Sequence, residues 1–119
     1  MASVQALLDP SDVDGLLAAS REQPVMLLKH SIACPVSARG QREFVLFGEE
    51  DEDFPLYAVV VQYAREASAY VAEALGLRHE TPQVILVKDG EAIYDASHLA
   101  ITREALREAA REATADAAS

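Results

Sequence analysis

The sequence has one cysteine in 119 residues, no tryptophan, and half as many basic as acidic side chains. A single thiol cannot form a disulfide within the chain, which excludes a small disulfide-stabilised scaffold. It cannot build a four-cysteine zinc site either, and the three histidines show no paired ligand spacing, so no metal centre is predicted. The net charge of −10 argues against nucleic acids and anionic membranes as partners.

Long apolar runs are also absent. No segment approaches the roughly 18 apolar residues of a membrane helix, and the first ten residues lack the basic and apolar regions of a secretory signal. Together with the lone thiol, these absences predict a cytoplasmic protein in a reducing compartment. The length and the half-hydrophobic composition predict a single domain spanning residues 1–119.

Hydrophobic periodicity predicts both strands and helices, and therefore the α/β class. Apolar runs of strand length lie at 25–29, 57–62 and 83–88, and a shorter run at 4–8 is either an edge strand or an ordered tail. Helices are predicted at 12–20 with Ser11 as N-cap, at 35–47, at 64–75 with Gly76 as C-cap, and from 102 to about 114, followed by a tail of small residues.

Two further patterns complete the outline. The five consecutive acids at 49–53 predict a solvated loop. Asp89-Gly90 predicts a hairpin that pairs 83–88 with 91–94 in antiparallel fashion. The resulting order of strand, helix, strand, helix, strand, helix, hairpin and helix is that of the thioredoxin fold, a central mixed sheet flanked by helices. Reactive groups in such folds lie beyond the carboxyl end of a central strand, where Cys34 is found.

Cys34 stands immediately before Pro35, a residue favoured in the first turn of a helix. The unpaired amides of a helix start favour the thiolate, which is the nucleophile in disulfide exchange. The alternative interpretation is an inert, buried structural cysteine. Ser37, three residues later, could donate a hydrogen bond to the thiolate or be an ordinary first-turn residue. Serine cannot act as the second thiol of a Cys-x-x-Cys site, so a resolving thiol must come from outside.

Other polar residues flank the predicted strands. In a thioredoxin-like arrangement the Thr81–Pro82 bond is cis and faces the cysteine, so that the Thr81 backbone can pair with an extended substrate; a trans proline that only introduces a strand is the alternative. His30 could bind substrate, stabilise the thiolate as an imidazolium or relay a proton, or serve as a structural group at a strand end. Lys29 could add positive field.

Residues 29–37, Lys-His-Ser-Ile-Ala-Cys-Pro-Val-Ser, resemble the active-site segment of the monothiol bacilliredoxin family, which typically reads K-H-S-T-x-C-P-I-S. The Thr-Pro-Gln sequence at 81–83 looks like the cis-proline element of that family, and Ser-His-Leu-Ala-Ile-Thr at 97–102 looks like its S-H-x-x-I-T signature. Ile32, Val36 and Leu99 depart from the usual residues, which puts the details of substrate recognition in doubt.

The resemblance implies an oxidoreductase in which Cys34 is the nucleophile, Pro35 and Ser37 complete its motif, and Thr81 with Pro82 form the wall that faces the substrate. It further implies that bacillithiol is the co-substrate, that it is removed from mixed disulfides on client proteins, and that no organic cofactor is needed. Two alternatives stay open: a glutathione-dependent monothiol glutaredoxin, and a non-enzymatic thioredoxin-like binding module that meets a basic partner through the acids at 49–53. The sequence is compatible with a monomer or a homodimer.

Overall fold

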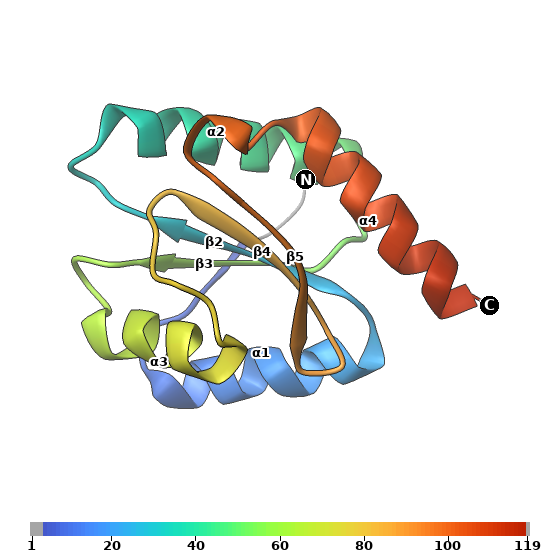
Figure 1. The fold of residues 1–119 in the computed structure, drawn as a ribbon, viewed down its shortest axis with the longest axis horizontal. Coiled ribbons are helices and arrows are strands. Elements are labelled where there is room, and N and C mark those ends of the chain that lie inside the picture. Colours follow the sequence, from blue (N-terminus) through green and yellow to red (C-terminus); the bar gives the residue numbers. More distant parts are fainter. Residues whose placement is uncertain (1–3, 119) are drawn as a thin grey trace.

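A five-stranded mixed sheet separates two layers of helices (Figure 1). The structure is a computed structural model and describes residues 4–118. The strands are β1 (Val4–Ala6), β2 (Val25–His30), β3 (Leu56–Val60), β4 (Gln83–Lys88) and β5 (Glu91–Ser97). The helices are α1 (Pro10–Glu22), α2 (Pro35–Glu50), α3 (Arg65–Leu75) and α4 (Arg103–Ala118), with a short 3-10 turn, η1, at His98–Ala100.

The strand order is β1-β3-β2-β4-β5, and these strands form the mixed sheet of the thioredoxin fold that the order of the elements predicted. β1, β3 and β2 run parallel, whereas β4 is antiparallel to both β2 and β5. β2 lies in the centre, and all six of its residues are buried. This explains why its sequence is a continuous apolar run rather than an alternating one, since both faces of the strand are covered by helices.

The sheet has a hydrophobic core on each face. On one face, Met26 and Leu28 of β2 pack with Phe44 and Phe47 of α2 and with Leu106 of α4. The intervening residues Val25 and Leu27 of β2 point to the other face, where the core includes residues of α1 and α3: Val13, Leu16, Ala67 and Val71. The period-two alternation of a strand therefore assigns alternate residues of β2 to different cores.

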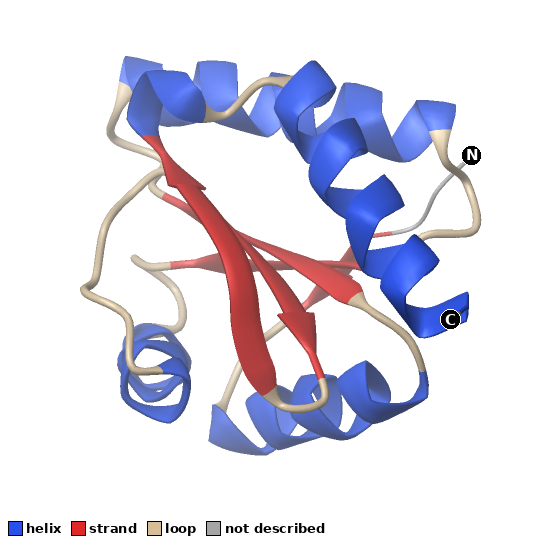
Figure 2. Ribbon diagram, turned by 45° about the vertical axis from the view of Figure 1, so that its right-hand side comes forward, coloured by secondary structure: helices blue, strands red, loops and turns tan. Residues whose placement is uncertain are grey.

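The carboxyl ends of β2, β3 and β5 and the start of β4 meet at one end of the sheet. In the register, Lys29 of β2 lies opposite Gln83 of β4, and Gln83 lies opposite Ser97 of β5. Three loops, at 31–34, 61–64 and 76–82, therefore emerge at this end, on the left of Figure 1 and of Figure 2, and η1 lies at the same end. All the predicted site residues belong to this end.

Two predictions at α1 were wrong. Asp9, not Ser11, is the N-cap, and α1 runs from Pro10 to Glu22 rather than over 12–20. The Asp9 carboxylate accepts a hydrogen bond from the Asp12 amide at 3.1 Å. The Asp12 carboxylate in turn accepts one from the Asp9 amide at 3.4 Å, and the two bonds form a capping box. Pro10 at the first helical position is the sequence signal that identifies this start.

The acidic block was also misassigned in part. Glu49 and Glu50 belong to the last turn of α2, which ends at Glu50 rather than at Phe47. Acidic side chains at a helix C-terminus are unfavourable, because the helix dipole places a partial negative charge there. Glu50 is stabilised instead by ion pairs with Arg103 at 3.9 Å and Arg107 at 3.5 Å, both on the neighbouring helix α4.

Three other boundaries shift by a few residues. β3 covers 56–60 rather than 57–62, and β5 extends to Ser97 rather than ending at Tyr94. α4 continues to Ala118 through most of the tail predicted after Thr114, in keeping with the high helix propensity of alanine. Other details are confirmed: β1 is an edge strand, β4 and β5 pair in antiparallel fashion, and Gly76 ends α3 with φ +64°. Within residues 4–118 no helix has the length and apolarity needed to cross a membrane.

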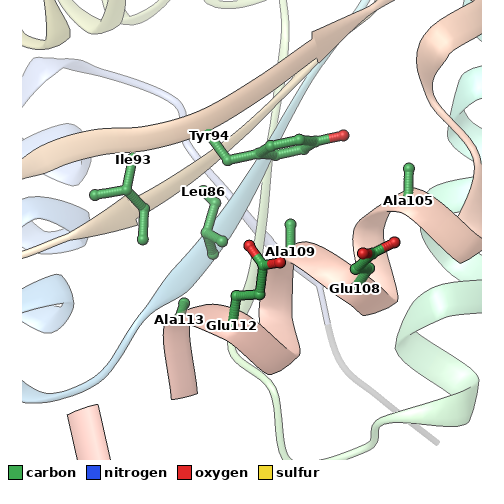
Figure 3. A pocket seen from close by; sticks show the side chains of 8 residues that line it. All are labelled: Leu86, Ile93, Tyr94, Ala105, Glu108, Ala109, Glu112 and Ala113. Carbon is green, nitrogen blue, oxygen red and sulfur yellow. The ribbon is translucent and has the colours of Figure 1, made fainter. Parts of the chain in front are cut away.

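A groove of about 360 Å³ lies between α4 and the β4–β5 hairpin (Figure 3). Ile93 and Tyr94 form one wall, and Glu108 and Glu112 of α4 stand at the other. Burial raises the pKa of Tyr94, and the nearby carboxylates of Asp95 and Glu108 raise it further. None of the predicted site residues lines this groove, so the chemistry must be sought at the carboxyl end of β2.

Gly40 allows α2 to approach the start of β4 closely. A Cβ atom placed at Gly40 would lie 3.2 Å from Pro82 Cβ and 3.3 Å from Ile101 Cδ1. Side chains essentially fill the space around this position, so even a methyl group must displace a neighbour. The close approach brings Pro82 against the helix that begins directly after Cys34.

Gly40→Ala is expected to lower the free energy of unfolding by about 1–2 kcal/mol, because overpacking outweighs the gain in helix propensity. Gly15→Ala is the matched control, since Gly15 is an exposed position of α1 with nothing within 4 Å of the added methyl group. It should raise stability by about 0.5–1 kcal/mol. Urea unfolding of both variants measures the two effects, and a stabilised Gly40→Ala protein would contradict the close approach.

Candidate active site

Cys34 occupies the N-cap position of α2, with Pro35 as the first helical residue. Its backbone is extended (φ −121°, ψ 122°), and its carbonyl accepts the amides of Ser37 at 3.1 Å and Ala38 at 3.2 Å. The side chain is half-buried and makes no capping hydrogen bond. The sulfur is therefore held at the open end of a helix, where unpaired amides favour a negative charge.

Ser37 supports the loop in front of Cys34 rather than the sulfur itself. Its side chain is fully buried, and its hydroxyl oxygen accepts the Ser31 amide at 2.9 Å. The same oxygen lies 2.9 Å from His30 Nδ1. Because the oxygen already accepts the Ser31 amide, its own hydrogen can be donated to the unprotonated imidazole nitrogen. The hydroxyl thus ties the end of β2 to the first turn of α2.

Gln62, in the turn after β3, holds the loop from the other side. Its amide oxygen accepts the Ile32 amide at 3.2 Å, and its amide nitrogen donates to Ser31 Oγ at 2.8 Å. Ser31 Oγ also accepts the Ala33 amide at 3.3 Å. Side chains of two other segments therefore accept two loop amides, and a side chain of the loop itself accepts a third, where regular secondary structure leaves these amides unpaired.

Thr81–Pro82 is a cis peptide bond, as the thioredoxin-like arrangement predicted. Pro82 is buried and lies near Gly40 of α2, while its carbonyl accepts the His98 amide at 3.0 Å. Thr81 is half-buried, and within residues 4–118 no hydrogen bond involves its main chain. An extended chain could therefore pair with this residue.

His30 and Lys29 point to opposite faces of the sheet, as adjacent strand residues must. Burial lowers the pKa of His30, although a hydrogen bond to the main chain of Ser37 opposes the shift. The ring is consequently neutral at pH 7 and supplies no fixed positive charge to Cys34. The contact between His30 and Ser37 is structural. The role of His30 in substrate binding stays a prediction.

Lys29 is fully buried on the α3 side of the sheet. Its ammonium lies 2.7 Å from Nδ1 of His79, a residue of the loop that leads to Thr81. Burial lowers the pKa of Lys29 to about 8, and the charge of Glu80 partly opposes this. No local sequence pattern connects Lys29 with His79, which is fifty residues away.

The structure thus brings the predicted site residues together at one end of the sheet. It adds three residues that the sequence did not identify: Gly40, Gln62 and His79. No local motif marks these residues, since each acts through a neighbour distant in sequence. In the part of the chain that the structure describes, no group of three or more histidine, cysteine, aspartate or glutamate residues is arranged to hold a metal ion.

Comparisons with known proteins agree with this geometry. The family model described as monothiol bacilliredoxin BrxC matches residues 5–106. A solved structure described as a candidate oxidoreductase with a thioredoxin fold is 30% identical, with a TM-score of 0.80, and the match covers 89% of this chain and 92% of that one.

Thioredoxins share the fold at much lower identity. Fasciola hepatica thioredoxin is 16% identical with a TM-score of 0.75, and the match covers 92% of this chain and 99% of that one. Mitochondrial thioredoxin 3 from Saccharomyces cerevisiae is 15% identical with a TM-score of 0.70, covering 92% and 94%. These two comparisons establish the thioredoxin fold and nothing about substrates.

Ser37→Ala is expected to lower the free energy of unfolding by about 1–3 kcal/mol, because the Ser31 amide and the His30 nitrogen both lose a buried partner. Ser68→Ala is the matched control: Ser68 is also a buried helical serine, but its hydroxyl has no hydrogen-bond partner. Its removal should leave stability unchanged or slightly raised. Equal losses in the two variants, measured by urea unfolding, would assign the effect to packing instead of hydrogen bonding.

Proposed function

The chain belongs to the monothiol bacilliredoxin family, and from this premise we propose that it is a thiol-disulfide oxidoreductase that removes bacillithiol from client proteins through Cys34. The observation that carries the proposal is the half-buried Cys34 sulfur, which lies at the open start of α2 and has no hydrogen-bond partner among residues 4–118. A sulfur in this position is accessible to an incoming disulfide. A structural cysteine would lie in apolar surroundings.

The proposed step is a thiol-disulfide exchange. The Cys34 thiolate attacks the sulfur of bacillithiol in the mixed disulfide, forms a new S–S bond and breaks the old one. The client leaves as a thiolate and takes a proton from water, while bacillithiol remains on Cys34. No net oxidation occurs, so no organic cofactor is required.

The arrangement around Ser37 explains why the exchange stops at this stage. Ser37 stands where a Cys-x-x-Cys protein has its second thiol, but its side chain is an alcohol that is fully buried and bonded to Ser31 and His30. It has no sulfur with which to attack the mixed disulfide. Regeneration of Cys34 therefore requires a second, external thiol.

Thr81 supports the proposed binding of the substrate. Its main-chain groups are unbonded within the described residues, and Pro82 fixes it beside α2. A substrate segment that passes Cys34 in an extended conformation would pair with Thr81 as a short strand pairs with a sheet edge. Ile32, in the loop after β2, and Leu99, in η1, have 55% and 66% of their surfaces exposed at the same end and provide apolar area for a client protein.

The test is the intact mass of the reduced protein after mixing with a client carrying bacillithiol and, separately, with the same client carrying glutathione. We expect Cys34 to gain the mass of bacillithiol rapidly at neutral pH and that of glutathione at least tenfold more slowly. Cys34→Ser should gain neither, since it lacks the attacking sulfur.

Each other outcome has a defined meaning. Faster uptake of glutathione than of bacillithiol would contradict the choice of small thiol and favour a glutaredoxin-like activity. A lack of uptake from both clients would contradict the activity itself and favour the interpretation as a binding module.

A further inference from the structure

A second pocket, separate from the Cys34 sulfur, lies between α3 and His79. It has a volume of about 360 Å³ and is lined by Val61, Arg65, Ser68, Ala69, Ala72 and His79. No acidic side chain lines it, although the chain carries twenty acids against ten bases. Each polar side chain of the lining can donate a hydrogen bond, and none of them carries a negative charge.

A buried positive charge stands behind this pocket. Lys29 is fully buried, and its ammonium has three hydrogens to donate, but within residues 4–118 its one hydrogen-bond partner is His79. Glu80, the acid whose charge acts on Lys29, is already paired with Arg78 at 3.7 Å and His98 at 3.4 Å. A buried ammonium without a carboxylate partner is unfavourable, and a bound anion would compensate it.

The bond to Lys29 also fixes the tautomer of His79. An ammonium can only donate, so Nδ1 of His79 accepts, and the ring hydrogen of the neutral imidazole is on Nε2. Burial and the charge of Lys29 lower the pKa of His79, in agreement with a neutral ring. His79 consequently has a polarised N–H group that is not used by Lys29.

Ser68 and Arg65 add two further donors. The Ser68 hydroxyl is buried and has no hydrogen-bond partner among the residues that the structure describes, which is rare for a polar group inside a protein. The exposed Arg65 makes no ion pair in the described part of the chain. Its guanidinium presents two parallel N–H groups that match the geometry of a carboxylate.

We propose that this pocket binds a small organic carboxylate, with Arg65 and His79 as the recognising groups, Ser68 as a third donor and Lys29 as the buried charge behind them. The apolar wall of Val61, Ala69 and Ala72 suits the carbon skeleton of an organic acid and gives nothing to inorganic phosphate. The site does not depend on the proposed exchange at Cys34.

The pocket lies between the two segments that hold the active-site loop. Val61 directly precedes Gln62, which bonds Ser31 and Ile32. His79 is two residues before Thr81. A bound carboxylate would therefore link the segment of Gln62, which holds the loop before Cys34, to the segment of Thr81, which faces the substrate.

The test is a titration of the reduced full chain with succinate at low salt, followed by amide and imidazole nitrogen chemical shifts. We expect saturation at millimolar succinate, with the largest changes at 61–72 and 77–80 and at His79 Nε2. Inorganic phosphate should bind at least tenfold more weakly. Arg65→Gln should weaken succinate binding about tenfold or more, the loss expected for one charge-assisted contact.

Three variants complete the design. Arg111→Gln removes an equal charge from an exposed position of α4 and should bind succinate as the unmodified chain does. Lys29→Met keeps the volume of the buried chain and should fold but bind at least tenfold more weakly. Ser68→Ala should fold normally and bind several-fold more weakly.

The proposal is overturned by any of three results. These are an absence of saturable shifts, equal effects of Arg65→Gln and Arg111→Gln, or phosphate binding as tight as that of succinate. Because the assay does not involve Cys34, neither these results nor the expected ones bear on the proposed exchange.

Discussion

The close approach between Gly40 of α2 and Pro82 at the start of β4 is the constraint on which the geometry of the site depends. Cys34 begins α2 and Thr81 precedes Pro82, so the position of one element against the other fixes the nucleophile relative to the unpaired main chain of Thr81. A side chain at residue 40 would separate the two elements. Glycine at position 40, which is 42 residues before Pro82 in the sequence, is therefore as important for the geometry of the active site as the motif around Cys34.

Hydrogen bonds from outside the loop then give the loop its shape. Ser37 and Gln62 hold Ser31 and Ile32 through side-chain bonds, and Ser31 in turn holds Ala33, while the Cys34 side chain takes no part in this network. The side chains that hold the loop are therefore different from the sulfur that reacts. A preorganised loop with an unbonded sulfur suits a nucleophile that must form and release a disulfide, because the support need not rearrange when the sulfur reacts.

Much of the fold and of the candidate site could be predicted from the sequence. The buried strands, the hairpin at Asp89-Gly90 and the C-cap at Gly76 are local signals, and each is confirmed. The errors fall where a distant partner decides the outcome. Glu50 was expected in a solvated loop because it belongs to a block of five consecutive acids, but it lies in the last turn of α2, where Arg103 and Arg107 of α4 pair with it. At α1 the local signal was present, in Asp9 and Pro10, and was misread in favour of Ser11.

The sequence by itself determined the order of the elements, the position of Cys34 at a helix start and the lack of a second thiol, because periodicity, proline placement and residue identity are local properties of the chain. Only the tertiary structure decided what surrounds them. In the tertiary structure Ser37 bonds Ser31 and His30, Gln62 bonds the loop at Ser31, and the buried Lys29 bonds His79. These contacts join residues as far apart as fifty positions, and they arise only when strands that are remote in sequence pair and bury polar groups that must then find partners.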